Sequence, residues 1–156
     1  MIAFTSSVNS KVRSSEHALT VVNRTRQRLP LAFLRRAARI ALTRLGITNY
    51  TVSVVLVGRQ RSRTLNATFR KKDAATNVLS FPYVASHAGL TGDVVVCVPV
   101  AVAEAKKYSR SARMHLAMLT VHGIVHLAGY DHETSREARR MERLEAAIAR
   151  KLGISE

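Results

Sequence analysis

The chain has 156 residues, with 25 Lys and Arg against 10 Asp and Glu, a formal net charge of +15, and 47% hydrophobic residues. This length fits one compact domain that buries enough apolar surface to fold without disulfides or a structural metal, so disorder along most of the chain is excluded. The single cysteine, Cys97, lies in an apolar run, which favours a buried, reduced thiol. No apolar stretch is long enough for a membrane span or a secretory signal, so we expect a soluble, cytoplasmic protein.

The first half of the chain predicts a strand, a helix, a strand and a helix. Residues 1 to about 29 are polar and rich in Ser and Arg. This composition also fits an organellar import signal, but we prefer a first strand in the apolar opening, residues 1–4. Apolar residues at helical spacing predict an amphipathic helix from Pro30 to Gly46 with an arginine-bearing face. The β-branched segment 51–57 predicts a strand, and 60–68 a short helix.

The second half predicts two strands and then three helices. After a turn-like segment, a strand is expected at 77–83, where Pro82 limits further pairing. A loop with Gly89 and Gly92 leads to the almost wholly apolar strand 93–98, which suits the centre of a sheet. The helices are expected at about 99–109, 112–128 and 135–152. Because there are no repeats or linkers, we predict a single α+β domain over 1–156, with a small mixed sheet of about four strands and about five helices.

The positive charge is concentrated in the first half of the chain. Residues 1–78 hold 15 basic and 2 acidic side chains, with no acid between Glu16 and Asp73. Arginine, with 19 residues against 6 lysines, suits bidentate contacts to phosphate, so we expect a nucleic-acid partner. A solvated arginine-rich face caused by genome composition is the alternative, but it does not explain the missing acids. The candidates for contacts to the RNA backbone are Arg59, Arg61, Arg63, Lys71 and Lys72.

Aromatic residues are sparse in this basic half. Only Phe69, Phe81 and Tyr83 occur near its end, so the sequence does not indicate a stacking platform for single strands. Contact with the phosphate backbone is the safer expectation.

Four of the six histidines fall between residues 115 and 132. His122 and His126 are four residues apart on a predicted helix, so their rings project from one face and could close on one ion. Gly129 can end the helix and let the following turn bring His132 to the same point. Three imidazoles with an open fourth position are typical of a catalytic zinc site. The alternative is a set of ordinary polar residues on a histidine-rich helix.

The residues around this trio allow more than one role. Gly123 stands where the H-E-x-x-H motif has its general-base Glu, which argues against a conventional metalloprotease and leaves the metal to activate water. His115 could lie in the outer shell or contact substrate, or it could be a satisfied core histidine. Asp131 could orient a ligand imidazole or cap the turn.

The segment HGIVHLAGYDH, residues 122–132, resembles the signature HGxLHLxGYDH of the YbeY family of rRNA maturation factors, and the blocks 65–82 and 91–97 resemble two further family segments. The resemblance implies a metal-dependent endoribonuclease with a compact α+β fold. It implies one zinc ion per chain held by His122, His126 and His132, with Arg70 as the functionally important arginine. Ala75 stands where the family usually has Pro, which loosens the turn before Thr76.

The resemblance also implies the substrate and partners: single-stranded rRNA, 3′-end maturation of the small-subunit rRNA, and the small ribosomal subunit. Zinc would polarise a phosphoryl oxygen or activate water, and Arg70 would offset charge on the phosphate. Thr76, Asn77 and Ser80 could donate to the substrate, or could only make turn and strand hydrogen bonds. We expect no organic cofactor and no membrane partner, and the oligomeric state is open. The alternative functions are a metal-stabilised ribosome-assembly factor with little activity and a zinc peptidase.

Overall fold

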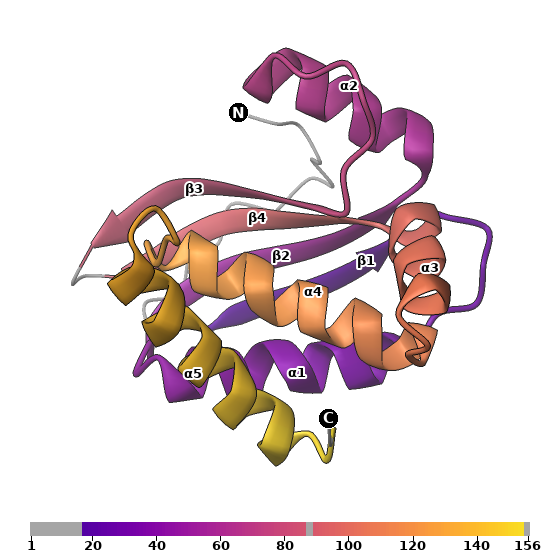
Figure 1. Ribbon diagram of the computed structural model, residues 1–156. Coiled ribbons are helices and arrows are strands. Elements are labelled where there is room, and N and C mark those ends of the chain that lie inside the picture. Colours follow the sequence, from indigo (N-terminus) through magenta and orange to yellow (C-terminus); the bar gives the residue numbers. More distant parts are fainter. Residues whose placement is uncertain (1–16, 87–88, 155–156) are drawn as a thin grey trace.

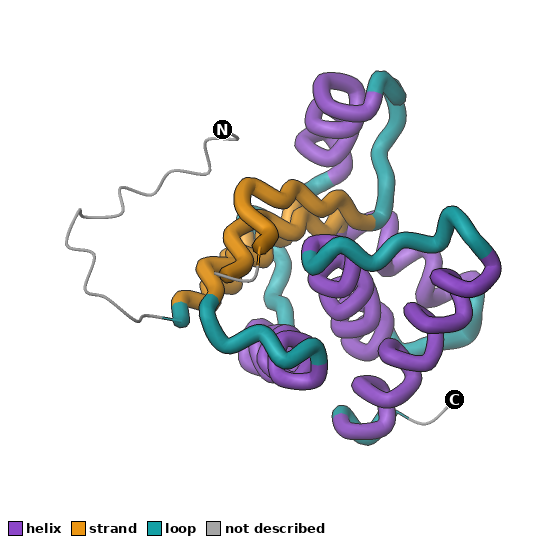
Figure 2. The backbone as a smooth tube through the Cα atoms, turned by 90° about the vertical axis from the view of Figure 1, so that its left-hand side faces the viewer, coloured by secondary structure: helices purple, strands orange, loops and turns teal. Residues whose placement is uncertain are grey.

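The computed structural model describes residues 17–86 and 89–154, which form a four-stranded sheet with helices on both faces (Figure 1). In the part described, α1 and α4 cover one face, α5 packs against both of them, and α2 lies on the opposite face, as the turned view also shows (Figure 2). No described helix is long and apolar enough to cross a membrane. The elements are β1 (Ala18–Asn23), α1 (Leu31–Arg44), β2 (Tyr50–Val57), α2 (Arg59–Arg70), β3 (Val78–Ser86), β4 (Gly89–Cys97), α3 (Val98–Lys107), α4 (Ala112–Leu127) and α5 (Ser135–Lys151).

The strand order is β1-β2-β4-β3, with β1, β2 and β4 parallel and β3 antiparallel to β4. The apolar run that ends at Cys97 forms the buried part of β4, between β2 and β3, and Cys97 itself is fully buried. The predicted mixed sheet, the five helices and the α+β class are therefore confirmed, as is the buried thiol.

The first described strand is not where we predicted it. Residues 1–4 lie outside the described residues, whereas β1 falls at residues 18–23, inside the segment we had taken as polar. β1 is an edge strand that pairs with β2 on one side alone, and Val21 is its one buried residue. The strand does carry the apolar residues Leu19, Val21 and Val22, but they are too few to stand out in a segment that is polar as a whole.

The hairpin of β3 and β4 extends further than predicted. Pairing does not stop at Pro82, which lies opposite Gly92; it continues to Ser86 after a register shift between Pro82 and Val84. Proline is tolerated there because β3 is an edge strand, on which one side of the backbone needs no partner. Gly89 and Gly92 accordingly belong to β4 rather than to a loop.

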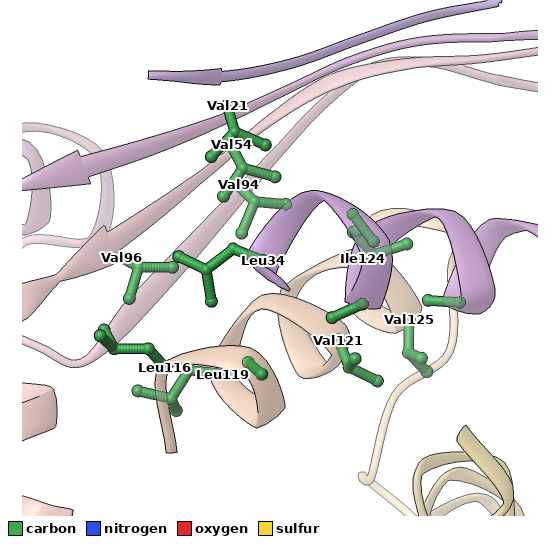
Figure 3. Packing of buried hydrophobic residues seen from close by; sticks show 14 of the residues in the cluster. Val21, Leu34, Val54, Val94, Val96, Leu116, Leu119, Val121, Ile124 and Val125 are labelled. Atoms are coloured by element: carbon green, nitrogen blue, oxygen red, sulfur yellow. The ribbon is translucent and has the colours of Figure 1, made fainter. Parts of the chain in front are cut away.

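The core lies on both faces of the sheet. The larger cluster joins the sheet to α1, α4 and α5, and Figure 3 shows Val21, Val54 and Val94 of the strands facing Leu34 of α1. The smaller cluster, Val55, Val57, Leu65, Leu79 and Val95, lies under α2. The sheet is thus a two-sided core that holds α2 and α4 on opposite faces.

At Gly123, α4 packs so closely against the sheet that there is no space for a side chain. A Cβ atom at this position would lie 2.4 Å from Val94 Cγ1 and 3.1 Å from Val78 Cγ2. The Ser80 hydroxyl of β3 donates a hydrogen bond of 2.7 Å to the Gly123 carbonyl oxygen. Close packing of this kind fixes both the height of α4 above the sheet and its rotation.

We predict that Gly123→Ala destabilises the protein by about 1–3 kcal/mol, because the added methyl overpacks a full core. The measurement is urea unfolding followed by circular dichroism. Replacing Val94 by Ala makes room for the methyl, so the double variant should lose less stability than the sum of the two single variants. A Gly123→Ala protein that is as stable as the parent, or more so, would contradict the close packing, since alanine at an open helix position is worth about 1 kcal/mol more than glycine.

Candidate metal centre

The two helix-borne histidines are placed by the local structure of α4. Ser111 caps the helix by accepting a hydrogen bond from the Met114 backbone N–H. His122 and His126, one turn apart, have ring centroids 4.6 Å from each other. The face-sharing predicted from their spacing is therefore confirmed.

The turn between α4 and α5 brings His132 back toward the two histidines of α4. Gly129 ends the helix with a φ of +93°, which favours glycine, and the capping box of Thr134 and Glu137 starts α5. Between them, the His132 ring comes to 5.1 Å from His126 and 6.3 Å from His122, centroid to centroid. The three rings converge, as the sequence predicted.

The described residues form a group of possible metal ligands from two of the three rings and one carboxylate, and His122 is not a member of this group. His126, Asp131 and His132 each offer one ligand atom, and these atoms all lie within 4.8 Å of one another, so the group could bind a metal ion. The Asp131 carboxylate also accepts a 2.7 Å hydrogen bond from the His132 backbone N–H, which fits the turn-capping role considered for it. The donor set of imidazole nitrogen and carboxylate oxygen suits zinc.

His122 is held by a residue that the sequence analysis missed. Glu145 of α5 lies 2.6 Å from Nδ1 of His122, Oε1 to nitrogen, and both side chains are partly buried. Because Nδ1 is engaged, Nε2 is the nitrogen left for a metal ion. A signal was present: Glu145 interrupts the apolar positions Met141, Ile148 and Leu152, which recur at helical spacing and are buried.

The electrostatics favour neutral imidazole at the centre of the group. Burial lowers the pKa of His126, and the neighbouring His122 and His132 lower it further, while Asp131 and Glu145 act in the opposite direction. A neutral ring is the form that binds a metal ion. Gly123 faces Val78 and Val94, so the position that carries the Glu of H-E-x-x-H has no room for a carboxylate here.

The structure gives most of the other candidates structural contacts. His115 is buried, with Nε2 2.8 Å from Oε2 of Glu104. The same carboxylate accepts from the Asn77 side chain, so these three residues tie α4, α3 and the start of β3 together. The Ser80 hydroxyl donates to the Gly123 carbonyl oxygen. The Ser62 hydroxyl donates to the Thr76 carbonyl oxygen and accepts from the Thr76 backbone N–H. These contacts match the turn and strand alternatives; direct contact with substrate stays a prediction.

The basic candidates lie on α2 and in the segment after it, with Arg70 exposed at the end of the helix. α2 lies on the sheet face opposite α4 (Figure 1), and among the described residues no hydrogen bond joins Arg70 to the histidines. Arg63, one of the candidates for contacts to the RNA backbone, makes a bidentate ion pair with Asp73, at 2.7 and 2.9 Å, and its contact with RNA stays a prediction. This guanidinium lowers the pKa of Asp73 through the hydrogen bond and its charge. The functional role of Arg70 stays a prediction.

Known proteins resemble the chain over most of its length. A family model described as "Endoribonuclease YbeY" matches residues 20–153. The chain is similar to proteins called endoribonuclease YbeY from Bordetella pertussis, at 43% identity over 83% of this chain and 87% of that protein, and from Aromatoleum aromaticum, at 42% over 94% and 96%. It also resembles the solution structure of TM1509 from Thermotoga maritima, with a TM-score of 0.59 and 22% identity over 85% of this chain and 90% of that one. The last likeness supports the fold alone.

We predict that Glu145→Ala lowers zinc affinity by about 10- to 100-fold, because loss of the carboxylate frees the His122 ring to rotate and change tautomer. Competition with a chromogenic chelator measures this affinity. Glu142→Ala, which removes an exposed carboxylate from the same helix, is the matched control and should bind zinc as the parent does. Equal zinc affinity of the Glu145→Ala and Glu142→Ala proteins, with unchanged metal-free melting temperatures, would show that Glu145 does not position His122.

Proposed function

The chain belongs to the YbeY family of endoribonucleases, and from this premise we propose that it is a zinc-dependent enzyme that cuts single-stranded RNA during maturation of small-subunit rRNA. Family membership by itself supports an RNA-cleaving hydrolase. The zinc ion, the ribosomal substrate, association with the small ribosomal subunit and action in the cytoplasm are the additions that we propose.

The observation that carries the proposal is the convergence of His122, His126 and His132 beside two carboxylates. These three imidazoles would hold the zinc ion. When bound, zinc supplies Lewis-acid polarisation of a phosphoryl oxygen and positive charge for the transition state. The chain's own part is to keep His126 neutral by burial and to hold His122 in one orientation through Glu145.

The substrate would be held through its phosphates. Arg59, Arg61, Lys71 and Lys72 are exposed on α2 and just after it. Such contacts release counterions, so binding should weaken steeply with salt and should select little by sequence. Arg70 would stabilise charge that develops on the scissile phosphate.

We predict that His126→Ala loses bound zinc and RNA cleavage, whereas Arg70→Ala keeps zinc but cuts about 100-fold more slowly, the typical effect of losing one charge-stabilising group. Metal content is measured by atomic emission, and cleavage on a labelled single-stranded RNA. Arg150→Ala, which removes an exposed arginine near the end of α5, is the control and should cut normally.

The same experiment separates the enzyme from the alternative, a metal-stabilised ribosome-assembly factor. If the His126→Ala protein loses its zinc, and the His126→Ala and Arg70→Ala proteins still cleave the RNA at the rate of the parent, the zinc-dependent enzyme is excluded and the assembly factor remains.

A further inference from the structure

The loop between β1 and α1 carries three arginines close together. Arg24, Arg26 and Arg28 are all exposed. In the part of the chain that the structure describes, none of the three forms an ion pair. The sequence holds no Asp or Glu between Glu16 and Asp73, so no acid lies near them along the chain. Like charges at this spacing repel one another, and an anionic partner would remove the repulsion.

The loop is held in one conformation by its own polar side chains. The Asn23 carboxamide oxygen accepts hydrogen bonds from the Thr25 backbone N–H, at 2.9 Å, and from the Thr25 hydroxyl, at 2.7 Å. The Asn23 Nδ2 donates to the Gln27 carbonyl oxygen at 2.8 Å, and the Gln27 backbone N–H donates to the Thr25 hydroxyl at 3.2 Å. Asparagine often closes turns in this way. Asn23 and Thr25 are thus engaged within the loop, whereas the arginines are exposed.

Both ends of the loop are fixed to the rest of the protein. The Arg24 backbone N–H donates a 2.8 Å hydrogen bond to the Leu56 carbonyl oxygen of β2. At the other end, Leu29 packs against the larger core cluster just before α1 begins. Because a fixed loop has little conformational entropy left to lose, it binds a partner at a lower entropic cost than a flexible one. The three arginines therefore form a preorganised cationic surface.

This arginine loop, residues 24–28, lies at the end of the sheet opposite the candidate metal centre, at the right of Figure 1. Because β1 and β2 are parallel, the loop follows β1 at the end of the sheet where α2 follows β2. Arg59, the first residue of α2, comes three residues after Leu56, to which the loop is bonded. The turn that bears His132 follows the far end of α4, whose 16 residues correspond to about 24 Å of helix. The loop is therefore close to the start of α2 and remote from the histidines.

The side chains of the loop suit phosphate groups. A guanidinium binds two phosphate oxygens at once, and it does so better than an ammonium group. Residues 24–28 contain only arginine, threonine and glutamine, so the loop offers no apolar group to enter a lipid bilayer or to fill a pocket of a protein partner. For a chain that belongs to a family of endoribonucleases, RNA is the polyanion that these observations favour.

We propose that Arg24, Arg26 and Arg28 bind the phosphate backbone of RNA, as an anchor that is separate from the metal centre and extends the cationic surface of α2. Contacts to phosphates position an RNA strand without reading its sequence. The anchor would therefore add affinity for any RNA long enough to reach from the loop toward the histidines. The inference rests on the proposed function and adds a second surface that holds its substrate.

The test measures binding of a fluorescent oligouridine at several salt concentrations. It has about 24 nucleotides, enough to span the sheet at about 3.4 Å per stacked nucleotide. All proteins carry His126→Ala, so that RNA is not cut. In the loop variant, Arg24, Arg26 and Arg28 are all replaced by Gln. Binding in about 0.1 M salt should weaken about 10- to 100-fold, and the slope of log affinity against log salt should become shallower by about 2, since each phosphate contact contributes about 0.7.

Two further variants separate the anchor from net charge and from folding. The charge-matched control replaces three exposed cations of α5 by Gln, namely Arg143, Arg150 and Lys151. It should keep the affinity and the salt slope of the parent. Replacing the three loop arginines by Lys keeps the charge and should also keep the slope. Because all these side chains are exposed, the melting temperatures should stay close to that of the parent.

Equal affinity and equal salt slope of the loop variant and the α5 control would overturn the proposal, because net charge would then explain any change. A lysine variant whose slope falls as far as that of the glutamine variant would overturn it as well. Binding is measured without cleavage, so the result is independent of whether the parent protein proves to be an active nuclease. In the protein with His126 intact, the loop variant should retain its zinc, which separates loss of the anchor from loss of the metal centre.

Discussion

The contact on which the site depends is the close approach of α4 to the sheet at Gly123. With no side chain there, the helix backbone packs against Val78 and Val94 and accepts a hydrogen bond from Ser80. This contact sets the rotation of α4, and His122 and His126 are consequently held clear of the sheet, where Glu145 of α5 and the returning His132 can meet them. Gly123 stands where the H-E-x-x-H motif has its general-base Glu, and here it orients the two imidazoles of α4 by setting the rotation of the helix.

The sequence was most informative where structure is local. Helical spacing and a glycine stop were enough to predict that His122, His126 and His132 converge, and the apolar run before Cys97 was enough to predict a central strand. Contacts between distant segments were not predicted: Glu145 joins His122 from another helix, and Glu104 joins His115 in the same way. The place of Glu145 among buried apolar positions of α5 marks it as unusual, but nothing in the sequence names His122 as its partner. The edge strand β1 was missed because its short apolar stretch, with Leu19, Val21 and Val22, lies inside a segment whose overall composition is polar.

The two faces of the sheet have different roles in the proposed function. One face carries α4 and the histidines, and the other carries α2 and its cations. Metal binding needs fixed, partly buried ligands, whereas binding of RNA through its phosphates needs exposed positive charge, so the two requirements are met by different packing environments. β3 packs against both sides, through Ser80 to α4 and through Leu79 in the core under α2.

The central claim is that three imidazoles hold one cation and leave a position for the substrate. A crystal grown with zinc and measured at the zinc absorption edge tests it directly. The account predicts one anomalous peak about 2.0–2.2 Å from Nε2 of His122 and from a ring nitrogen each of His126 and His132, with no fourth protein ligand. A peak held elsewhere, three rings turned away from the ion, or Asp131 closing the fourth position would contradict it.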